Sequence, residues 1–199
     1  MAPASAFNLV GGHVALDLAN TLDNRFDAAR TTELLAAYGD FLRFAQQAGV
    51  IDATQAARLN GCPEREKQAA LRVARDLREL LQRLFSAAAR GERMNPEDLS
   101  LLNQSWQKII RHRMLVEERG TIRWTWTDLA STALAPLWPI VFAAAELLVS
   151  PELAHVRECG AETCRWLFLD LSKNHSRRWC DMKICGNRTK ARRYYQAHS

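Results

Sequence analysis

Four cysteines near the end of the chain have the residue type and spacing of a metal-binding finger. Four residues separate the members of each pair and fifteen separate the two pairs, which are Cys159 with Cys164 and Cys180 with Cys185. Zinc takes four ligands at tetrahedral corners, and cysteine thiolate is one of its preferred ligands. The spacing therefore predicts a four-thiolate Zn²⁺ site made by Cys159, Cys164, Cys180 and Cys185.

The same cysteines could instead form two disulfides or stay as free thiols. The N-terminus has no basic residue ahead of an apolar run, which is not typical of a secretory leader, so we expect a cytoplasmic protein with reduced thiols. A catalytic zinc needs an open ligand position, and four thiolates leave none. His175 could replace one ligand, but we favour a turn histidine in solvent, and Cys62 fits an ordinary half-buried thiol.

The chain around the cysteines must bring the two pairs together. Residues 165–170 are typical of a strand, residues 172–175 of a turn, and residues 177–179 return toward the third cysteine, so we expect a hairpin between the pairs. Residues 186–196 contain good helix formers, which predicts a short basic helix beginning at the metal. Its arginines at 188 and 192 and its tyrosine at 195 fall on one helical stripe.

Positive charge is concentrated in the segment that holds the four cysteines. Residues 157–199 contain 10 Lys and Arg against 4 Asp and Glu, whereas residues 1–156 contain 17 against 18. Replacing four thiol protons with one Zn²⁺ lowers the charge of this tail from +6 to +4, so the excess needs another partner. Nucleic acid is the partner that such a patch favours. The candidate contacts are Arg177, Arg178, Lys183, Arg188, Lys190, Arg192 and Arg193.

The first 150 residues must form the body that carries this segment. Apolar residues spaced by three and four predict helices at 14–22, 32–49, 63–90 and 95–110, a short helix from Asp52 and a last helix ending at Leu148. Residues 114–126 change to β-branched and aromatic types around Gly120, which predicts a hairpin. Trp124 and Trp126 would then share one face, as core residues more than as a ligand cage.

Length and composition limit the overall architecture. The 199 residues, 48% hydrophobic and 25% charged, suit one core plus a small module and exclude a disordered or collagen-like chain. The longest apolar stretch, 134–149, is interrupted by two prolines and a glutamate and is too short to span a bilayer, so we expect no membrane partner. The predicted fold is α+β and mainly α, with a helical domain at 1–150 and a zinc module at 151–199.

Two motifs resemble known families. Cys185-Gly186-Asn187-Arg188, after the first three cysteines, resembles the CGNR zinc finger, and residues 9–25 resemble the start of the ABATE domain that precedes this finger in bacterial proteins. The resemblance implies a treble-clef-like finger, a stress-induced transcriptional regulator, the four cysteines as zinc ligands and an N-terminal domain that binds a small ligand. It also implies that Asn187 caps the basic helix or contacts DNA, and that Arg188 braces the thiolates or contacts DNA.

A polar cluster in the N-terminal motif is the candidate ligand site. Asp17, Asn20 and Thr21 stand at i, i+3 and i+4, so they share one face of a helix. They could line a pocket, or they could cap the helix and brace the segment that follows, which we favour slightly. Arg25 could pair with Asp17 or hold an anionic ligand.

Together these features favour a zinc-containing, double-stranded-DNA-binding transcription factor. A single finger would bind weakly, so we expect a homodimer, with the exposed side of helix 63–90 as one candidate face. A module that binds RNA or docks onto a protein is the alternative, because aromatic side chains could stack on bases unless they form the finger's own core. These are Trp166, Phe168, Trp179, Tyr194 and Tyr195. With no nucleophile motif and no phosphate loop, we expect no enzyme activity.

Overall fold

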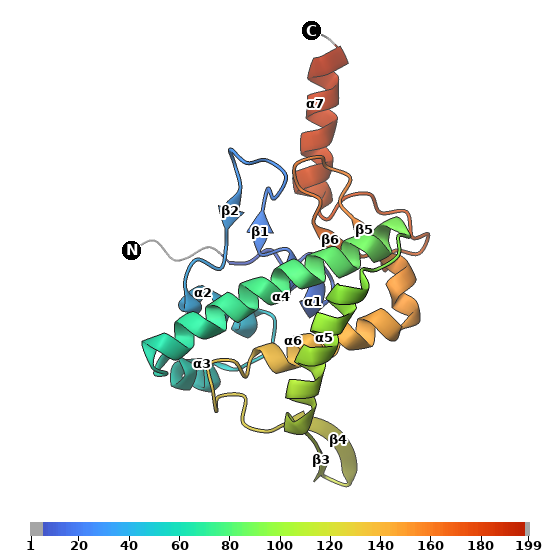
Figure 1. The fold of residues 1–199 in the computed structure, drawn as a ribbon. Coiled ribbons are helices and arrows are strands. Elements are labelled where there is room, and N and C mark those ends of the chain that lie inside the picture. The colour runs from blue at the N-terminus through green and yellow to red at the C-terminus, as the bar shows by residue number, and fades with distance from the viewer. Residues whose placement is uncertain (1–5, 198–199) are drawn as a thin grey trace.

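The computed structural model describes residues 6–197, without the side chains of Arg193 and Ala197. Helices fill most of the first 150 residues, and the C-terminal helix projects from one end of the molecule (Figure 1). The helices are α1 (Val14–Ala19), α2 (Tyr38–Gln47), α3 (Ala53–Asn60), α4 (Glu64–Arg90), α5 (Pro96–Ile109), α6 (Leu137–Val149) and α7 (Asn187–Ala197). Short 3-10 turns η1 (Ile110–His112) and η2 (Pro151–His155) and a π-turn, η3 (Met182–Gly186), link them.

Six short strands form three separate antiparallel pairs among the described residues. They are β1 (Leu22–Asp23) with β2 (Thr32–Glu33), β3 (Arg113–Glu118) with β4 (Thr121–Trp126), and β5 (Val156–Glu158) with β6 (Leu167–Leu169). The mainly helical α+β fold expected from the sequence is confirmed.

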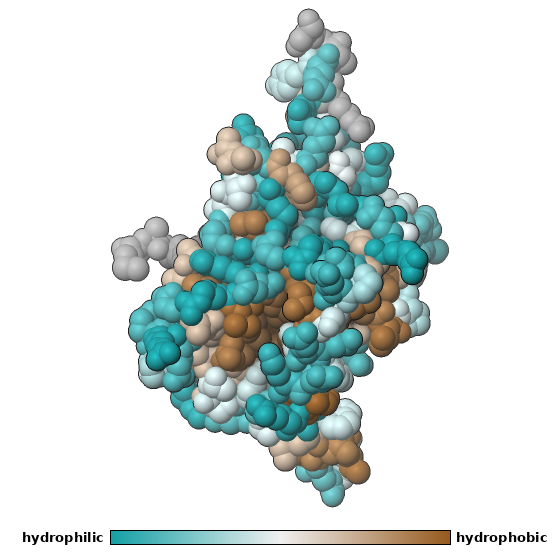
Figure 2. All heavy atoms as spheres, in the orientation of Figure 1, coloured by the Kyte–Doolittle hydropathy of each residue, from teal (hydrophilic) through white to brown (hydrophobic). Residues whose placement is uncertain are grey.

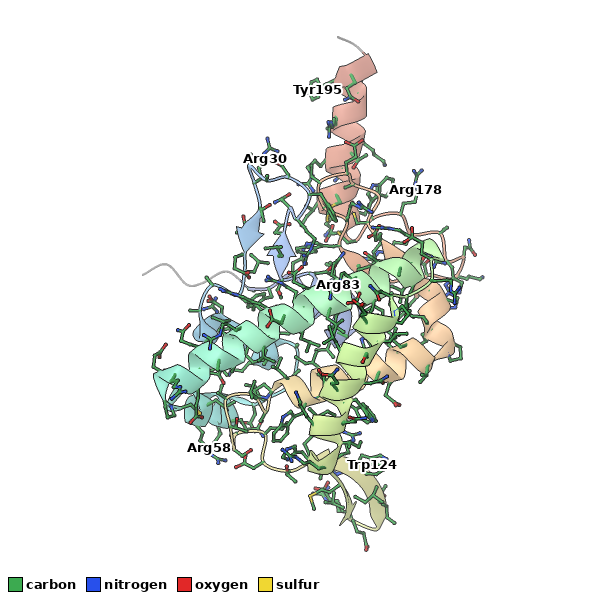
Figure 3. All side chains as sticks on the ribbon, viewed as in Figure 1. Arg30, Arg58, Arg83, Trp124, Arg178 and Tyr195 are labelled. Carbon is green, nitrogen blue, oxygen red and sulfur yellow. The ribbon has the colours of Figure 1, made fainter. Side chains whose placement is uncertain are left out.

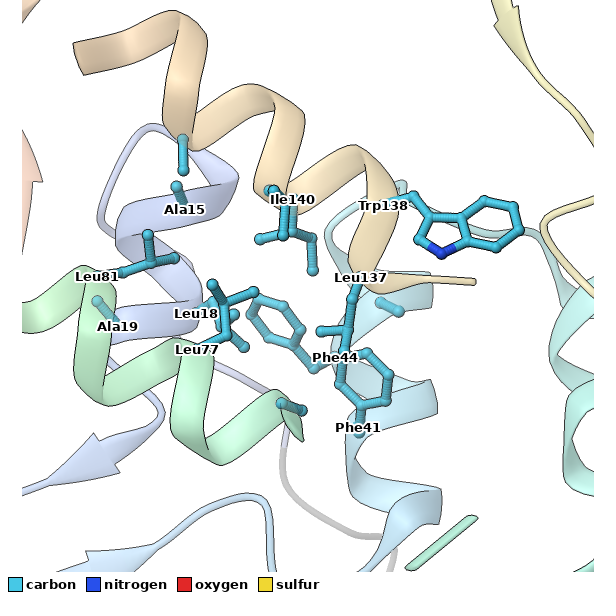
Figure 4. Packing of buried hydrophobic residues seen from close by; sticks show 14 of the residues in the cluster. Ala15, Leu18, Ala19, Phe41, Phe44, Leu77, Leu81, Leu137, Trp138 and Ile140 are labelled. Carbon is cyan, nitrogen blue, oxygen red and sulfur yellow. The ribbon is translucent and has the colours of Figure 1, made fainter. Parts of the chain in front are cut away.

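The core is built around the short helix α1, five of whose six residues are buried. Leu18 of α1 lies among Leu77 of α4, Phe44 of α2 and Ile140 of α6 (Figure 4). Because α1 also packs against β6, it contacts the helical body on one side and the cysteine-bearing segment on the other. The N-terminal motif therefore occupies the centre of the molecule.

Local signals predicted several helix ends and the hairpin correctly. Pro63 precedes α4, which ends at Gly91 with φ 67°, a left-handed conformation that glycine adopts without strain. The Asn95 side chain accepts a hydrogen bond from the N–H of Glu97 at the start of α5. Strands β3 and β4 turn at Gly120, where φ is 78°.

Two predicted helices were too long. The segment expected as a helix at 32–49 begins with strand β2, and α2 starts only at Tyr38, where Asp40 accepts the N–H of Ala37 and caps the helix. The helix expected at 14–22 ends at Ala19, and the Thr21 hydroxyl donates to the carbonyl of Leu18. In both places local side-chain bonds to the backbone compete with further helix.

The hairpin of the finger also differs from the expectation. Residues 167–169 do form a strand, but its partner is β5, so the hairpin flanks the first cysteine pair and does not connect the two pairs. The returning segment is held by another contact, in which the N–H of Gly160 donates to the carbonyl of Arg178 at 2.8 Å.

Strand β6 joins the finger to the helical body. Leu167 and Leu169 are buried in the main core, whereas Phe168 between them is buried with the cysteines, as strand alternation requires. The Asn20 side chain accepts the N–H of Leu167 and donates to its carbonyl, both at 2.8 Å, and the N–H of Leu169 donates to Gly11. The segments 1–150 and 151–199 thus meet in one continuous core.

We expect Asn20→Ala to destabilise the protein by about 2–3 kcal/mol, because it leaves a buried N–H and a buried carbonyl of Leu167 without partners. Urea unfolding of the metal-loaded protein measures the change. Asn103→Ala, at an exposed position of α5, is the matched control and should change stability by less than about 0.5 kcal/mol. Equal effects of the two substitutions would show that the Asn20 contact adds no stability.

Candidate metal centre

The four predicted cysteines converge on one buried point. Their sulfur atoms all lie within 4.8 Å of one another, and the Sγ of Cys180 lies 3.6 Å from the Sγ atoms of both Cys164 and Cys185. A disulfide would need about 2.05 Å, whereas a zinc–sulfur bond of about 2.3 Å gives tetrahedral edges near 3.8 Å. The donor set and its spacing therefore fit one tetrahedrally bound metal ion.

The electrostatics of the cluster also call for a cation. Hydrogen bonds from the other three thiols lower the pKa of Cys159. The hydrogen bond with Cys159 raises the pKa of Cys185, but those with Cys164 and Cys180 outweigh it, so the pKa of Cys185 is also lowered. The hydrogen bond with Cys159 raises the pKa of Cys164 and of Cys180, which opposes ionisation of these two thiols. A divalent ion removes this conflict, because it holds several thiolates at once.

The first two ligands lie on the turn between β5 and β6. The N–H of Cys159 donates to the carbonyl of Trp166 at 2.8 Å, which closes this turn, and the N–H of Cys164 donates to Ala161. Each cysteine is less than 5% exposed. The β5–β6 hairpin therefore holds the sulfur atoms of Cys159 and Cys164 at two corners of the tetrahedron.

The last two ligands are held at the start of helix α7. The Asp181 carboxylate accepts the N–H groups of Lys183 and Ile184, which begins the π-turn η3 that carries Cys185. The Thr189 hydroxyl donates to the carbonyl of Cys185, and the Arg188 guanidinium lies 3.4 Å from its sulfur. The predicted basic helix thus begins at the metal centre.

Aromatic side chains complete the small core of the finger. Phe168 is fully buried against the cysteines, and Trp166 and Trp179 pack partly buried beside them. The Arg177 guanidinium stacks 4.4 Å from the Phe168 ring and donates to the carbonyls of Trp179 and Cys180. Two of the Arg177 donors therefore hold the finger together, and its expected contact with nucleic acid stays a prediction.

Asp170 is a buried residue that the sequence did not single out. Its carboxylate accepts the N–H and hydroxyl of Ser172 and the N–H of Arg177. Burial alone would raise the pKa of Asp170, but these hydrogen bonds outweigh it and hold the pKa below its ordinary value. Asp170 therefore fixes the loop that returns the chain to Cys180.

Glu158, directly before the first ligand, ties the finger to α4. It accepts hydrogen bonds from Ser86 and Arg90 of α4 and from Arg165 across the hairpin. Burial would raise the pKa of Glu158, but these donors lower it below the ordinary value. The only sequence signal was a glutamate beside a cysteine, and its α4 partners lie more than sixty residues away in the chain.

The N-terminal polar cluster is buried and bonded to the surrounding backbone. Asp17 accepts the N–H of Gly11 at 2.8 Å, Asn20 holds Leu167, and Thr21 closes α1, and all three are buried. A Cβ at position 11 would lie 2.8 Å from the Asp17 carboxylate, so glycine is needed there. The bracing role is the one that the structure supports.

Arg25 pairs with Glu79 and not with Asp17. Its guanidinium forms an ion pair with Glu79 of α4 and also approaches the carbonyl of Ala19. Neither contact involves Asp17. Arg25 therefore links the loop after α1 to α4.

Neither His175 nor Cys62 belongs to the cluster. His175 is exposed, and its ring stacks on that of His155 with centroids 3.8 Å apart. Cys62 is half-buried beside the main core, as expected. Among the described residues, the four-cysteine group is the one set of ligand atoms close enough to share a metal.

The remaining basic residues face solvent around and along α7. Figure 3 shows Arg178 beside the base of this helix and Tyr195 near its far end. Lys183, Asn187, Arg188 and Lys190 are exposed, and Arg192 makes a surface ion pair with Glu162 at 3.1 Å. Arg193 lies within α7, but its side chain is outside the described part of the chain.

This geometry defines a mainly helical protein with a four-cysteine metal-binding finger at its C-terminal end. Residues 155–198 match the CGNR zinc finger, and residues 12–151 match the ABATE family, described as "Putative stress-induced transcription regulator". The ABATE match covers well over half of the chain, so the protein belongs to this family and carries a CGNR finger. Curated proteins give no match. Within residues 6–197, every helix is too short or too polar to cross a membrane.

We expect Cys180→Ser to lose the metal and the order of α7 while the helices within residues 14–149 remain, because most of their core consists of their own apolar side chains. Metal analysis and far-UV circular dichroism measure the two effects. Cys62→Ser is the matched control and should keep the metal. Loss of the whole helical signal in Cys180→Ser would show that finger and body unfold as one unit.

Asp17 should make stability depend on pH. Burial raises the pKa of Asp17 from 3.8 to about 6, so between these values the folded state keeps a proton that the unfolded state has lost. Stability from this group therefore falls as pH rises through that window. Asp17→Asn lacks the fall, so the stability of the variant relative to wild type should rise by about 2 kcal/mol between pH 4 and pH 7. A difference that stays constant with pH would contradict this account.

Proposed function

We propose that the protein binds zinc at Cys159, Cys164, Cys180 and Cys185 and, in that form, binds double-stranded DNA through α7 to regulate transcription. The observation that carries the proposal is the position of α7. This helix extends from the metal centre into solvent at one end of the molecule (Figure 1). Four thiolates suit zinc better than harder divalent ions, which prefer oxygen ligands.

The positive charge of α7 and its few packing contacts suit a helix that enters a nucleic acid groove. Its eleven residues include four cations and no acid. It contacts chiefly the turn η3 that precedes it, and a helix of this length is marginal in water without packing. A DNA groove would supply both the missing contact surface and the negative charge.

The ion pair at the edge of α7 is compatible with phosphate binding. The Arg192 and Glu162 side chains are both largely exposed, so their pair adds little stability and a phosphate can displace it. Arg178 and Lys183, near the base of α7, extend the positive surface. We assign Asn187 to the start of the helix and Arg188 to both the Cys185 thiolate and the DNA backbone.

RNA binding is less favoured because three of the aromatic candidates form the finger core. Trp166, Phe168 and Trp179 pack against the cysteines, which leaves Tyr194 and Tyr195 on α7 as the exposed aromatic pair. Two side chains on a helix offer a smaller stacking surface than single-stranded RNA recognition generally uses. We also propose no enzyme activity, which an assay for nuclease cleavage with added divalent ions tests.

We propose that a small-molecule ligand binds in a cavity beside the metal centre. It measures about 270 Å³ and lies between the N-terminal segment, α2 and the cysteine cluster. Its lining includes Arg43, Trp166 and Arg188 together with three of the four cysteines. A molecule bound there would contact the base of α7, which supports a coupling between ligand and DNA binding.

We expect the Lys190→Ala, Arg192→Ala variant to bind duplex DNA more weakly, and the slope of log affinity against log salt to fall by about 0.9 per lost phosphate contact. Fluorescence anisotropy with a labelled duplex at several salt concentrations measures both. Arg72→Ala, at an exposed position of α4, is the matched control and should leave the slope unchanged.

Selection from mixed genomic DNA fragments and total RNA identifies the natural target. The proposal expects enriched duplex sites that the Lys190→Ala, Arg192→Ala variant no longer selects. Enrichment of RNA alone, or of nothing once the salt concentration is raised, would overturn the DNA assignment.

A further inference from the structure

The β3–β4 hairpin carries an apolar face that its own chain leaves exposed. Antiparallel pairing puts Leu115 opposite Trp124 and Glu117 opposite Ile122 on this face. Leu115 and Trp124 are each 56% exposed, and Ile122 is 69% exposed. A two-stranded hairpin of this kind is only marginally stable in water without a packing partner.

The base of the hairpin is firmly attached to the body. The Arg113 guanidinium lies 4.1 Å from the Phe142 ring and 4.8 Å from the Trp126 ring, and these two rings pack edge to face. The same face of the hairpin then continues beyond the body with Trp124, Leu115 and Ile122. We call this projecting part, residues 113–126, the arm.

A groove between α4 and α5 has an apolar floor among polar side chains, which include Asp76, Gln104 and Lys108. It has a volume of about 330 Å³, and Leu101, 47% exposed, is on its α5 side, with apolar residues of α4 opposite. The α4 residues are Val73, Leu77 and Leu80. Figure 2 shows apolar surface in the angle between these helices and again on the hairpin, on the same side of the molecule.

We propose that two copies of the chain associate by reciprocal exchange, with the arm of each copy seated in the α4–α5 groove of the other. A two-fold axis makes each contact occur twice and closes the assembly. The occupant of the groove is thus a second copy of this chain. The inference is independent of the proposed DNA binding.

Distances along α5 before His112 match distances along the arm after His112, as a two-fold axis near His112 requires. At about 1.5 Å per helical residue, Ser105 and Leu101 lie roughly 10 Å and 16 Å before His112. At about 3.3 Å per strand residue, Leu115 and the Glu117–Ile122 pair lie roughly 10 Å and 16 Å beyond it. The hairpin follows the end of α5 in the chain (Figure 1), so on these lengths rotation about such an axis would put Ile122 of one copy at the level of Leu101 of the other.

Charges at the ends of the contact are complementary. Arg119 lies at the tip of the arm, and Asp76 is an exposed residue on the α4 side of the groove. Within the described residues, neither one makes an ion pair in its own chain, while Arg123 of the arm is already paired with Glu118. The tip of one arm can therefore pair with the groove of the other copy.

The proposed dimer would hold its two α7 helices far apart. The arm and α7 lie at opposite ends of the molecule (Figure 1). A dimer made through the arms therefore carries its two basic helices at opposite ends, where they can reach two separate nucleic acid segments. Adjacent half-sites of one palindrome would need the helices side by side.

Sedimentation velocity of the metal-loaded full chain without nucleic acid tests the proposal. Wild type should show a concentration-dependent dimer. Ile122→Glu in the arm and Leu101→Glu in the groove should each weaken it at least tenfold, because each puts a charge into both apolar contacts. Val149→Glu, at an 82% exposed apolar position outside arm and groove, is the matched control and should leave the dimer intact. Circular dichroism verifies that every variant is folded.

Mixing the two variants distinguishes reciprocal exchange from other dimers. A hybrid of an Ile122→Glu chain and a Leu101→Glu chain keeps one unaltered arm and groove in contact, so the mixture should dimerise better than either variant alone. A monomeric wild type, a dimer insensitive to either substitution, or a mixture no better than its components would overturn the proposal. DNA binding by a monomeric wild type would leave the proposed function standing while this inference fails.

Discussion

The finger depends on a divalent cation because four buried sulfur atoms lie within 4.8 Å of one another. Beyond β6 the chain buries few apolar side chains of its own, and its small core consists of the cysteines, Phe168 and parts of two tryptophans. So small a cluster cannot offset the entropy lost on ordering about thirty residues. A metal ion that binds all four thiolates supplies the missing free energy, and it also fixes where α7 begins.

The strand β6 makes this finger part of the larger fold. Leu167 and Leu169 point into the helical core and Phe168 into the finger, so one short strand serves as a wall of both. Asn20 and Glu158 reinforce the junction from either side, since Asn20 holds the backbone of Leu167 and Glu158 holds α4. Contacts therefore run without a break from the metal centre through β6 to α1 and through Glu158 to α4.

The two ends of the molecule differ in their surface chemistry. At one end α7 presents cations with no acid among its residues, and at the other the hairpin presents an apolar face. These surfaces require different partners, because phosphate is attracted by charge whereas Trp124 and Ile122 gain from exclusion of water. Separation of the two ends lets one partner bind without blocking the other.

Local spacing in the sequence was enough to predict most of the helices, the β3–β4 hairpin and the cysteine cluster. The cysteine pairs, Pro63 and Gly91 around α4, Asn95 before α5 and Gly120 in the hairpin each act on residues a few positions away, so their effects are visible in the sequence. The family motifs added the order of the two modules. The start of α2 lies later than the apolar spacing predicts, because the Asp40 carboxylate accepts the N–H of Ala37 and caps the helix there.

Only the tertiary structure decided which distant groups meet. Asn20 and Leu167 are 147 residues apart, Arg25 forms an ion pair with Glu79 on α4, and β5 pairs with β6 across the turn that carries the first two ligands. Residue types allow many such pairings, and the packing of whole helices and strands selects one of them. For the same reason the sequence could not show that the Arg177 guanidinium stacks on Phe168 and donates to a carbonyl of the finger, because that contact exists only in the folded chain.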